Sequence, residues 1–123
     1  MPDPNYTILY VKSIQNSTDF YTKLLKKAPL QASPTFSLFA LDSGLMLGLW
    51  SNQAVTPATT AIAGSGEIAF SVTNKQIVSE MFAEWVQQGL TIAQEPTDMD
   101  FGHTFLALDS DGHRLRVFAP IAP

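Results

Sequence analysis

Ala40-Leu41-Asp42-Ser43 and Ala107-Leu108-Asp109-Ser110 are the same four residues, and they lie 67 positions apart in the chain. A Thr-Phe pair precedes each copy, at Thr35-Phe36 and Thr104-Phe105, and a glycine turn with a further apolar stretch follows each. Self-similarity at one spacing is the mark of a repeated structural unit. The repeat therefore predicts two copies of a β-α-β-β-β unit, with any binding site where the copies meet.

Hydrophobic periodicity predicts the elements of the first copy. Runs of β-branched, aromatic and aliphatic residues predict strands over 6–11, 36–41 and 45–50. Between the first two strands, Ser13 or Asn16 is expected to cap a helix that Pro29 ends. The expected buried stripe of this helix is Phe20, Tyr21, Leu24 and Leu25.

The second copy repeats this order. Strands are expected over 67–72, 90–93, 105–108 and 115–118. Thr73 or Asn74 should cap the helix, Gly89 should end it, and Trp85 should lie in its buried stripe. We therefore expect a single domain over 1–123, made of modules 5–51 and 66–119 with a linker over 52–65.

The composition restricts the class of partner. Of the 123 residues, 46% are hydrophobic and only 15% are charged, which favours an oligomer interface or a site for an apolar ligand. The net charge of −4 argues against nucleic acid, because binding phosphates needs clustered Lys and Arg. The absence of cysteine excludes disulfides, zinc-thiolate sites and thiol nucleophiles.

The sequence shows no targeting or membrane signal. Met1-Pro2-Asp3-Pro4 lacks the basic and apolar regions of a secretory leader. No apolar run approaches the ~20 residues that a membrane-spanning helix needs. We therefore expect a cytoplasmic protein without a membrane partner.

Strand alternation predicts which side chains face a cleft between the copies. In 45–50 the three leucines should face the helix, which leaves Met46, Gly48 and Trp50 for the cleft. The same argument turns Tyr6 and Tyr10 inward on the first strand. In the second copy it turns Glu67 and Arg116 inward. The residues that complete the expected wall are Phe36, Phe101 and His103.

Each candidate has a structural alternative. Glu67 and Arg116 could bind a polar group of a ligand, or they could form a salt bridge, since a buried charge needs a partner. Trp50 could stack on a flat ligand or pack at the end of a barrel. Gly48 could clear a slot beside the indole or mark a bulge.

Core packing is the alternative for the other aromatic candidates. The two histidines are expected at the surface, with His113 in a solvated turn, and Asp98 and Asp100 are expected in a solvated loop. Neither histidine has a serine or cysteine at a spacing typical of a catalytic triad.

The order of several motifs resembles the vicinal-oxygen-chelate superfamily, which includes glyoxalase I, extradiol dioxygenases and bleomycin-resistance proteins. The motifs are Tyr10-Val11-Lys12-Ser13-Ile14 before Ser17-Thr18-Asp19-Phe20-Tyr21, then Gly66-Glu67-Ile68-Ala69-Phe70-Ser71-Val72, Phe101-Gly102-His103-Thr104-Phe105 and Asp109-Ser110-Asp111-Gly112-His113. Within the superfamily, the combination with Trp50 and the Arg-Val pair at Arg116-Val117 is most similar to phenazine-antibiotic resistance proteins. The resemblance implies an α+β fold in which two β-α-β-β-β modules form a curled, cup-like mixed sheet with the helices outside.

The resemblance also locates the metal site of the enzymes in this superfamily. Carried over position by position, the four ligand places hold Tyr6, Gly48, Glu67 and Arg116. Gly48 has no ligand atom, and a guanidinium has no lone pair to give. We therefore expect neither a metal nor a cofactor.

The function implied is non-catalytic sequestration of a small planar aromatic drug, such as a phenazine. The resemblance implies a homodimer whose clefts join Tyr6 and Trp50 of one chain to Glu67 and Arg116 of the other. The alternatives are a glyoxalase- or dioxygenase-like metal-dependent enzyme, and a carrier or sensor for another planar metabolite.

Overall fold

The computed structural model describes residues 4–60, 63–64 and 66–121. The chain divides into two compact units, Met1–Gly64 and Ser65–Pro123, and each is described by itself. Both contain one helix and one four-stranded mixed sheet, which confirms the predicted α+β fold of two β-α-β-β-β modules. Parts of the predicted linker and residues 1–3 lie outside the described residues. Neither described helix is long and apolar enough to cross a membrane.

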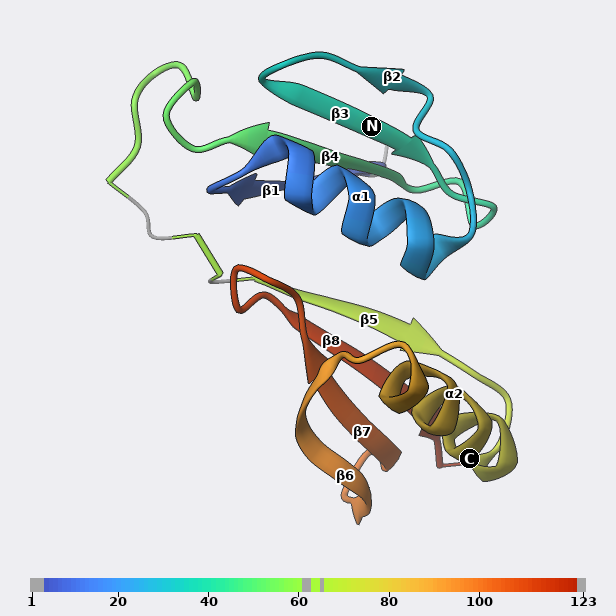
Figure 1. The fold of residues 1–123 in the computed structure, drawn as a ribbon. Coiled ribbons are helices and arrows are strands. Elements are labelled where there is room, and N and C mark those ends of the chain that lie inside the picture. Colours follow the sequence, from blue (N-terminus) through green and yellow to red (C-terminus); the bar gives the residue numbers. More distant parts are fainter. Residues whose placement is uncertain (1–3, 61–62, 65, 122–123) are drawn as a thin grey trace. The chain divides into compact units, whose positions relative to one another are not determined.

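The first unit has its strands in the order β1-β4-β3-β2, with α1 across one face of the sheet (Figure 1). Its elements are β1 (Tyr6–Val11), α1 (Ile14–Leu25), β2 (Gln31–Ala32), β3 (Phe36–Ala40) and β4 (Met46–Ser51). Strands β1 and β4 run parallel, whereas β4, β3 and β2 are antiparallel neighbours. The two-residue strand β2 was not predicted, because two residues are too few to show a period.

Helix α1 begins where the sequence indicates but ends earlier than expected. The Ser13 hydroxyl accepts a hydrogen bond from the backbone N–H of Asn16, which satisfies one free donor of the first turn. The helix ends at Lys26, whose left-handed backbone (φ 57°) stops it before Pro29. Tyr21 and Leu24 are buried against the sheet.

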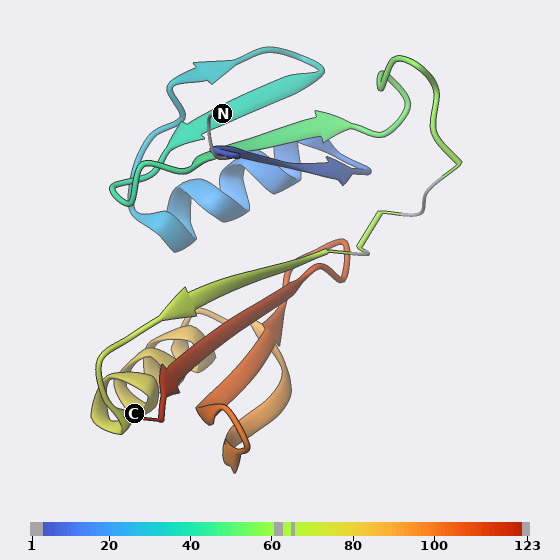
Figure 2. The same ribbon diagram turned by 180° about the vertical axis from the view of Figure 1, so that it is seen from behind.

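The second unit has the same topology, with strand order β5-β8-β7-β6 (Figure 2). Its elements are β5 (Glu67–Ser71), α2 (Lys75–Gln87), β6 (Thr91–Met99), β7 (Gly102–Leu108) and β8 (Arg114–Pro120). Strands β5 and β8 are parallel, and β8, β7 and β6 are antiparallel neighbours.

Helix α2 is fixed at both ends. The Asn74 side chain accepts from the N–H of Ile77 at 3.0 Å, as a helix cap should. At the other end, Gly89 adopts φ +86°, and the N–H groups of Gly89 and Leu90 donate to the carbonyls of Val86 and Trp85. This is the Schellman arrangement that favours glycine. Trp85 itself is 3% exposed, which confirms its predicted place in the core.

Strand β6 is much longer than the four residues predicted. Pro96 and two irregularities in the pairing with β7 interrupt its alternation, so the period-two pattern fades after Ala93. Asp98 therefore lies within a strand and not in a solvated loop.

The prediction of a solvated His113 is wrong. His113 is 2% exposed, and its Nδ1 lies 2.8 Å from Oδ2 of Asp109, which is also buried. Oδ1 of Asp109 accepts from the backbone N–H groups of Asp111 and His113. The turn needs this carboxylate because burial removes the water that would otherwise satisfy these donors.

The repeat provides a matched pair of variants for this turn. Asp109→Ala should destabilise the protein by about 2–4 kcal/mol, because it leaves buried donors without an acceptor. Its counterpart Asp42 is 99% exposed and pairs only with Lys27, so Asp42→Ala should cost less than about 0.5 kcal/mol. Urea denaturation of both variants measures the difference; equal effects would contradict this account of the turn.

Candidate functional site

The first sheet carries an aromatic row on the face opposite α1. Tyr10, Trp50 and Phe36 stand at one register on the adjacent strands β1, β4 and β3. The Trp50 ring meets Tyr10 at 6.4 Å and 79°, and it meets Phe36 at 6.2 Å and 87°. These edge-to-face contacts from both sides fix the indole, and all three rings remain partly exposed.

Gly48 lies in the next row of the same face, between Ile8 and Leu38. A Cβ at this position would lie 3.0 Å from Cζ of Phe36 and 3.2 Å from Cγ1 of Ile8. The room that the missing side chain leaves is therefore taken by the Phe36 ring. Gly48 positions an aromatic wall, where the sequence had suggested an open slot.

The remaining candidates of the first unit extend this face. Tyr6 and Met46 are register partners, and the exposed fractions of Tyr6 and Ile8 are 54% and 42%. Exposed apolar side chains of this size, standing next to the aromatic row, give the face an apolar surface that suits a flat apolar ligand.

The corresponding face of the second sheet carries a charged group. Glu67 on β5 accepts from Nε of Arg116 at 3.0 Å, and its other oxygen lies 3.2 Å from Nε of Arg114. Both arginines are on β8, two residues apart, so they share one face of the sheet. The structure brings Glu67 and Arg116 together, as the alternation argument required.

Arg116 is held on several sides. Its Nη1 donates to Thr104 at 3.2 Å and to Gln94 at 3.4 Å, and its guanidinium carbon lies 5.6 Å from the Phe101 ring centre. Its side chain is 14% exposed. Gln94 and Thr104 were not predicted as site residues, although each occupies the inward register position on its strand.

Phe101 lies at the turn between β6 and β7, and its ring meets Phe118 at 6.0 Å as well as Arg116. It therefore belongs to the charged face, as predicted. The described residues contain no group of three or more His, Asp or Glu side chains placed to hold a metal ion.

His103 does not belong to the charged face. It pairs with Ala119, whereas Thr104 and Leu106 pair with Phe118 and Arg116, so alternation turns His103 to the other face of the sheet. There its Nδ1 lies 2.7 Å from Oδ1 of Asp98. The prediction that His103 faces the same cleft as Arg116 is not supported by this register.

Asp98 joins His103 to the start of α2. The hydrogen bond from His103, followed by the hydrogen bond and charge of Lys75 at 3.2 Å, lowers the pKa of Asp98. These residues line a cavity of about 460 Å³ with Thr73, Asn74, Met99, Gly102, Ala119, Pro120 and Ile121.

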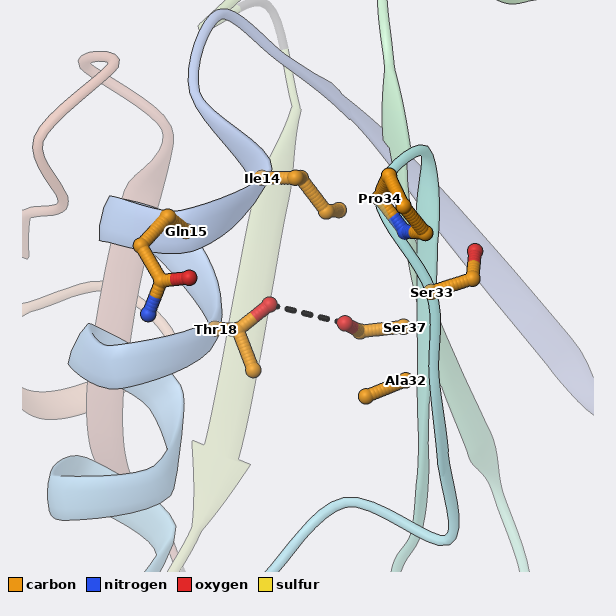
Figure 3. Close-up of a pocket in the computed structure, with 7 residues that line it drawn as sticks. All are labelled: Ile14, Gln15, Thr18, Ala32, Ser33, Pro34 and Ser37. Atoms are coloured by element: carbon orange, nitrogen blue, oxygen red, sulfur yellow. Dashed lines mark hydrogen bonds between the residues drawn. The ribbon is translucent and has the colours of Figure 1, made fainter.

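A second cavity, of about 480 Å³, lies between α1 and the β2–β3 edge of the first unit (Figure 3). Figure 3 shows the hydroxyls of Thr18 and Ser37 turned toward each other, 2.8 Å apart. The Ser33 hydroxyl bonds to the backbone of Phe36 in its own turn. Because these polar groups already satisfy one another, this cavity is a poorer ligand site than the aromatic and charged faces.

The fold and these two faces are those of a known superfamily. The profile of the Glyoxalase/Bleomycin resistance protein/Dioxygenase superfamily matches residues 4–117. The chain belongs to this superfamily, which confirms the resemblance noted in its motifs.

Individual relatives agree with this assignment. The chain is 32% identical over 117 residues to the phenazine antibiotic resistance protein EhpR of Enterobacter agglomerans, a match that covers 93% of this chain and 89% of that protein. The solution NMR structure of protein ATC0852 from Agrobacterium tumefaciens is 48% identical, with a TM-score of 0.89, and the match covers 99% of this chain and 100% of that one. A glyoxalase-related enzyme from Fulvimarina pelagi shares the fold, at 21% identity and a TM-score of 0.81 over 99% of this chain and 94% of that one.

The Asp98 contacts predict a stabilisation that depends on pH. A carboxyl whose pKa is lowered by folding stabilises the protein above its ordinary value of 3.8, and this contribution is lost as the pH falls through the lowered pKa. Asp98→Asn should therefore lower the melting temperature at about pH 7 and make progressively less difference in acid. Melting curves across this range test the sign; a difference that grows in acid would contradict it.

Proposed function

We propose that the protein binds a small planar aromatic compound of the antibiotic class, such as a phenazine, and sequesters it without chemical change. The ring of the ligand stacks at the aromatic row, and the charged face holds its polar edge. Bound drug is withdrawn from its target by mass action, so resistance needs no bond to be made or broken.

The single observation that carries the proposal is the row of Tyr10, Trp50 and Phe36. Core aromatics are buried, but these three rings remain partly exposed on the face opposite α1. Stacking on an oriented indole contributes about 0.5–1.5 kcal/mol beyond the area that it buries. The relative named as a phenazine antibiotic resistance protein, 32% identical over most of the chain, supports the same ligand class.

The charged face favours binding over catalysis. A general base needs a carboxylate or imidazole free to take a proton from the substrate. Glu67, the carboxylate on this face, accepts from two guanidinium groups, which hold it in its ionised form and occupy both its oxygens. At the superfamily's four ligand places, Gly48 and Arg116 offer no electron pair to a metal.

The proposal includes a cytoplasmic homodimer. Tyr6 and Ile8 expose large apolar surfaces on β1, an edge strand of the first sheet, and such surfaces are normally covered by a partner. In the proposed dimer, the aromatic row of one chain faces Glu67 and Arg116 of the other. Each dimer then has two equivalent sites.

Trp50 provides the direct test of ligand binding. Phenazine should quench the fluorescence of Trp50 on titration, and Trp50→Ala should weaken binding by about tenfold or more, because the stacking surface is lost. Calorimetric titration of the same variant measures the affinity without relying on the indole. Wild-type affinity in Trp50→Ala would remove the basis of the stacking proposal.

Two variants serve as controls for this experiment. Trp85→Phe removes the buried indole of α2, so it should leave the affinity for phenazine unchanged. Gly48→Ala keeps every aromatic ring but moves Phe36, since the new Cβ would lie 3.0 Å from its ring. It should weaken binding by about threefold to tenfold without altering the charged face.

Mixing two defective variants tests whether the site spans the dimer. Trp50→Ala and Arg116→Met should each bind poorly alone. After they are unfolded together and refolded in equal amounts, half of the dimers carry both chains, and each mixed dimer regains one of two sites. Calorimetry should then find about a quarter of the wild-type number of sites. No recovery, in a mixture shown by mass spectrometry to contain mixed dimers, would mean that the site lies within one chain.

A further inference from the structure

Arg114 and Arg116 are both of the arginines in this chain, and both bond to Glu67. One carboxylate between two guanidinium groups balances only one of them. The charged face therefore keeps an excess positive charge, although the chain as a whole carries −4. A local charge opposite in sign to the rest of the protein attracts ligands of its own choice of charge.

The two arginines are not equivalent. Arg116 has its Nε on Glu67, its Nη1 on Thr104 and Gln94, and its flat side near Phe101, and its side chain is only 14% exposed. Arg114 contacts Glu67 through Nε alone within the described part of the chain, and its side chain is 52% exposed. The terminal nitrogens of Arg114 thus remain available, and their forked geometry matches a carboxylate.

We propose that Arg114 selects, among planar aromatic ligands, those that carry an acidic group on the ring edge. This inference rests on the proposed function, because it assumes that the ring binds at the aromatic row. Glu67 acts as a positioning residue for Arg114: it holds Nε at 3.2 Å and so aims the outer nitrogens away from the sheet. Arg116 supports Glu67 from the other side and keeps that carboxylate ionised.

Two probes of equal size and different charge test the proposal. Phenazine-1-carboxylate carries the acidic group, and phenazine-1-carboxamide is its neutral analogue. The wild-type protein should bind the carboxylate about tenfold more tightly than the carboxamide, because a charge-assisted hydrogen bond is stronger than a neutral one. The preference should shrink as salt is added, since Arg114 is partly exposed.

Variants at Arg114 identify the source of the preference. Arg114→Gln should reduce the ratio of the two affinities to about twofold or less, while the affinity for the carboxamide stays as in wild type. Arg114→Lys keeps the charge but not the fork, so it should retain part of the preference. Lys23→Gln removes one positive charge from an exposed position on α1 and should leave the ratio unchanged.

The outcomes separate this inference from the proposed function. Equal affinities for the two probes in wild type, or a ratio that Arg114→Gln does not change, would overturn the role of Arg114 while binding of the ring still stands. If neither probe nor phenazine itself binds to the wild-type protein, the proposed function fails, and the inference fails with it.

Discussion

One geometric constraint organises this protein: a four-stranded sheet has two faces, and a single helix covers only one of them. In each unit the helix takes the face that carries the aliphatic residues, such as Leu47 and Leu49 in β4 and Leu115 and Val117 in β8. Because side chains alternate, the other residues of the same strands are turned to the uncovered face. The candidate ligand-binding surface is therefore a direct consequence of how the core is packed.

The two copies of the repeat have used their uncovered faces differently. The parallel pairs Tyr6–Met46 and Glu67–Arg114 hold equivalent places in the two sheets, and by the same register Gly48 corresponds to Arg116. In the first unit the Phe36 ring covers Gly48, and in the second the Phe101 ring lies near Arg116. One copy thus presents an apolar aromatic surface, whereas the other presents charge, and a ligand with a flat ring and a polar edge needs both.

Much of this arrangement follows from local sequence. Alternation in 45–50 was enough to separate the leucines from Met46, Gly48 and Trp50, because every residue of that strand keeps the period. Alternation fails in β6, where Pro96 and the irregular pairing break the period, so the strand's length and the positions of Gln94 and Asp98 could not be derived. His103 was misplaced for a related reason: its side is set by its pairing with Ala119, which the sequence does not display.

The contrast between the two Ala-Leu-Asp-Ser copies shows why identical residues need not do identical work. The Asp42 side chain is 99% exposed and meets Lys27, whereas Asp109 is buried and binds two backbone N–H groups and His113. The second turn has the sequence Asp109-Ser110-Asp111-Gly112-His113, longer than Asp42-Ser43-Gly44 before the next strand, and its added donors need an acceptor inside the protein. This turn leads directly into Arg114, the first residue of β8. A buried carboxylate that holds the turn rigid therefore also sets the start of the strand on which both arginines are carried.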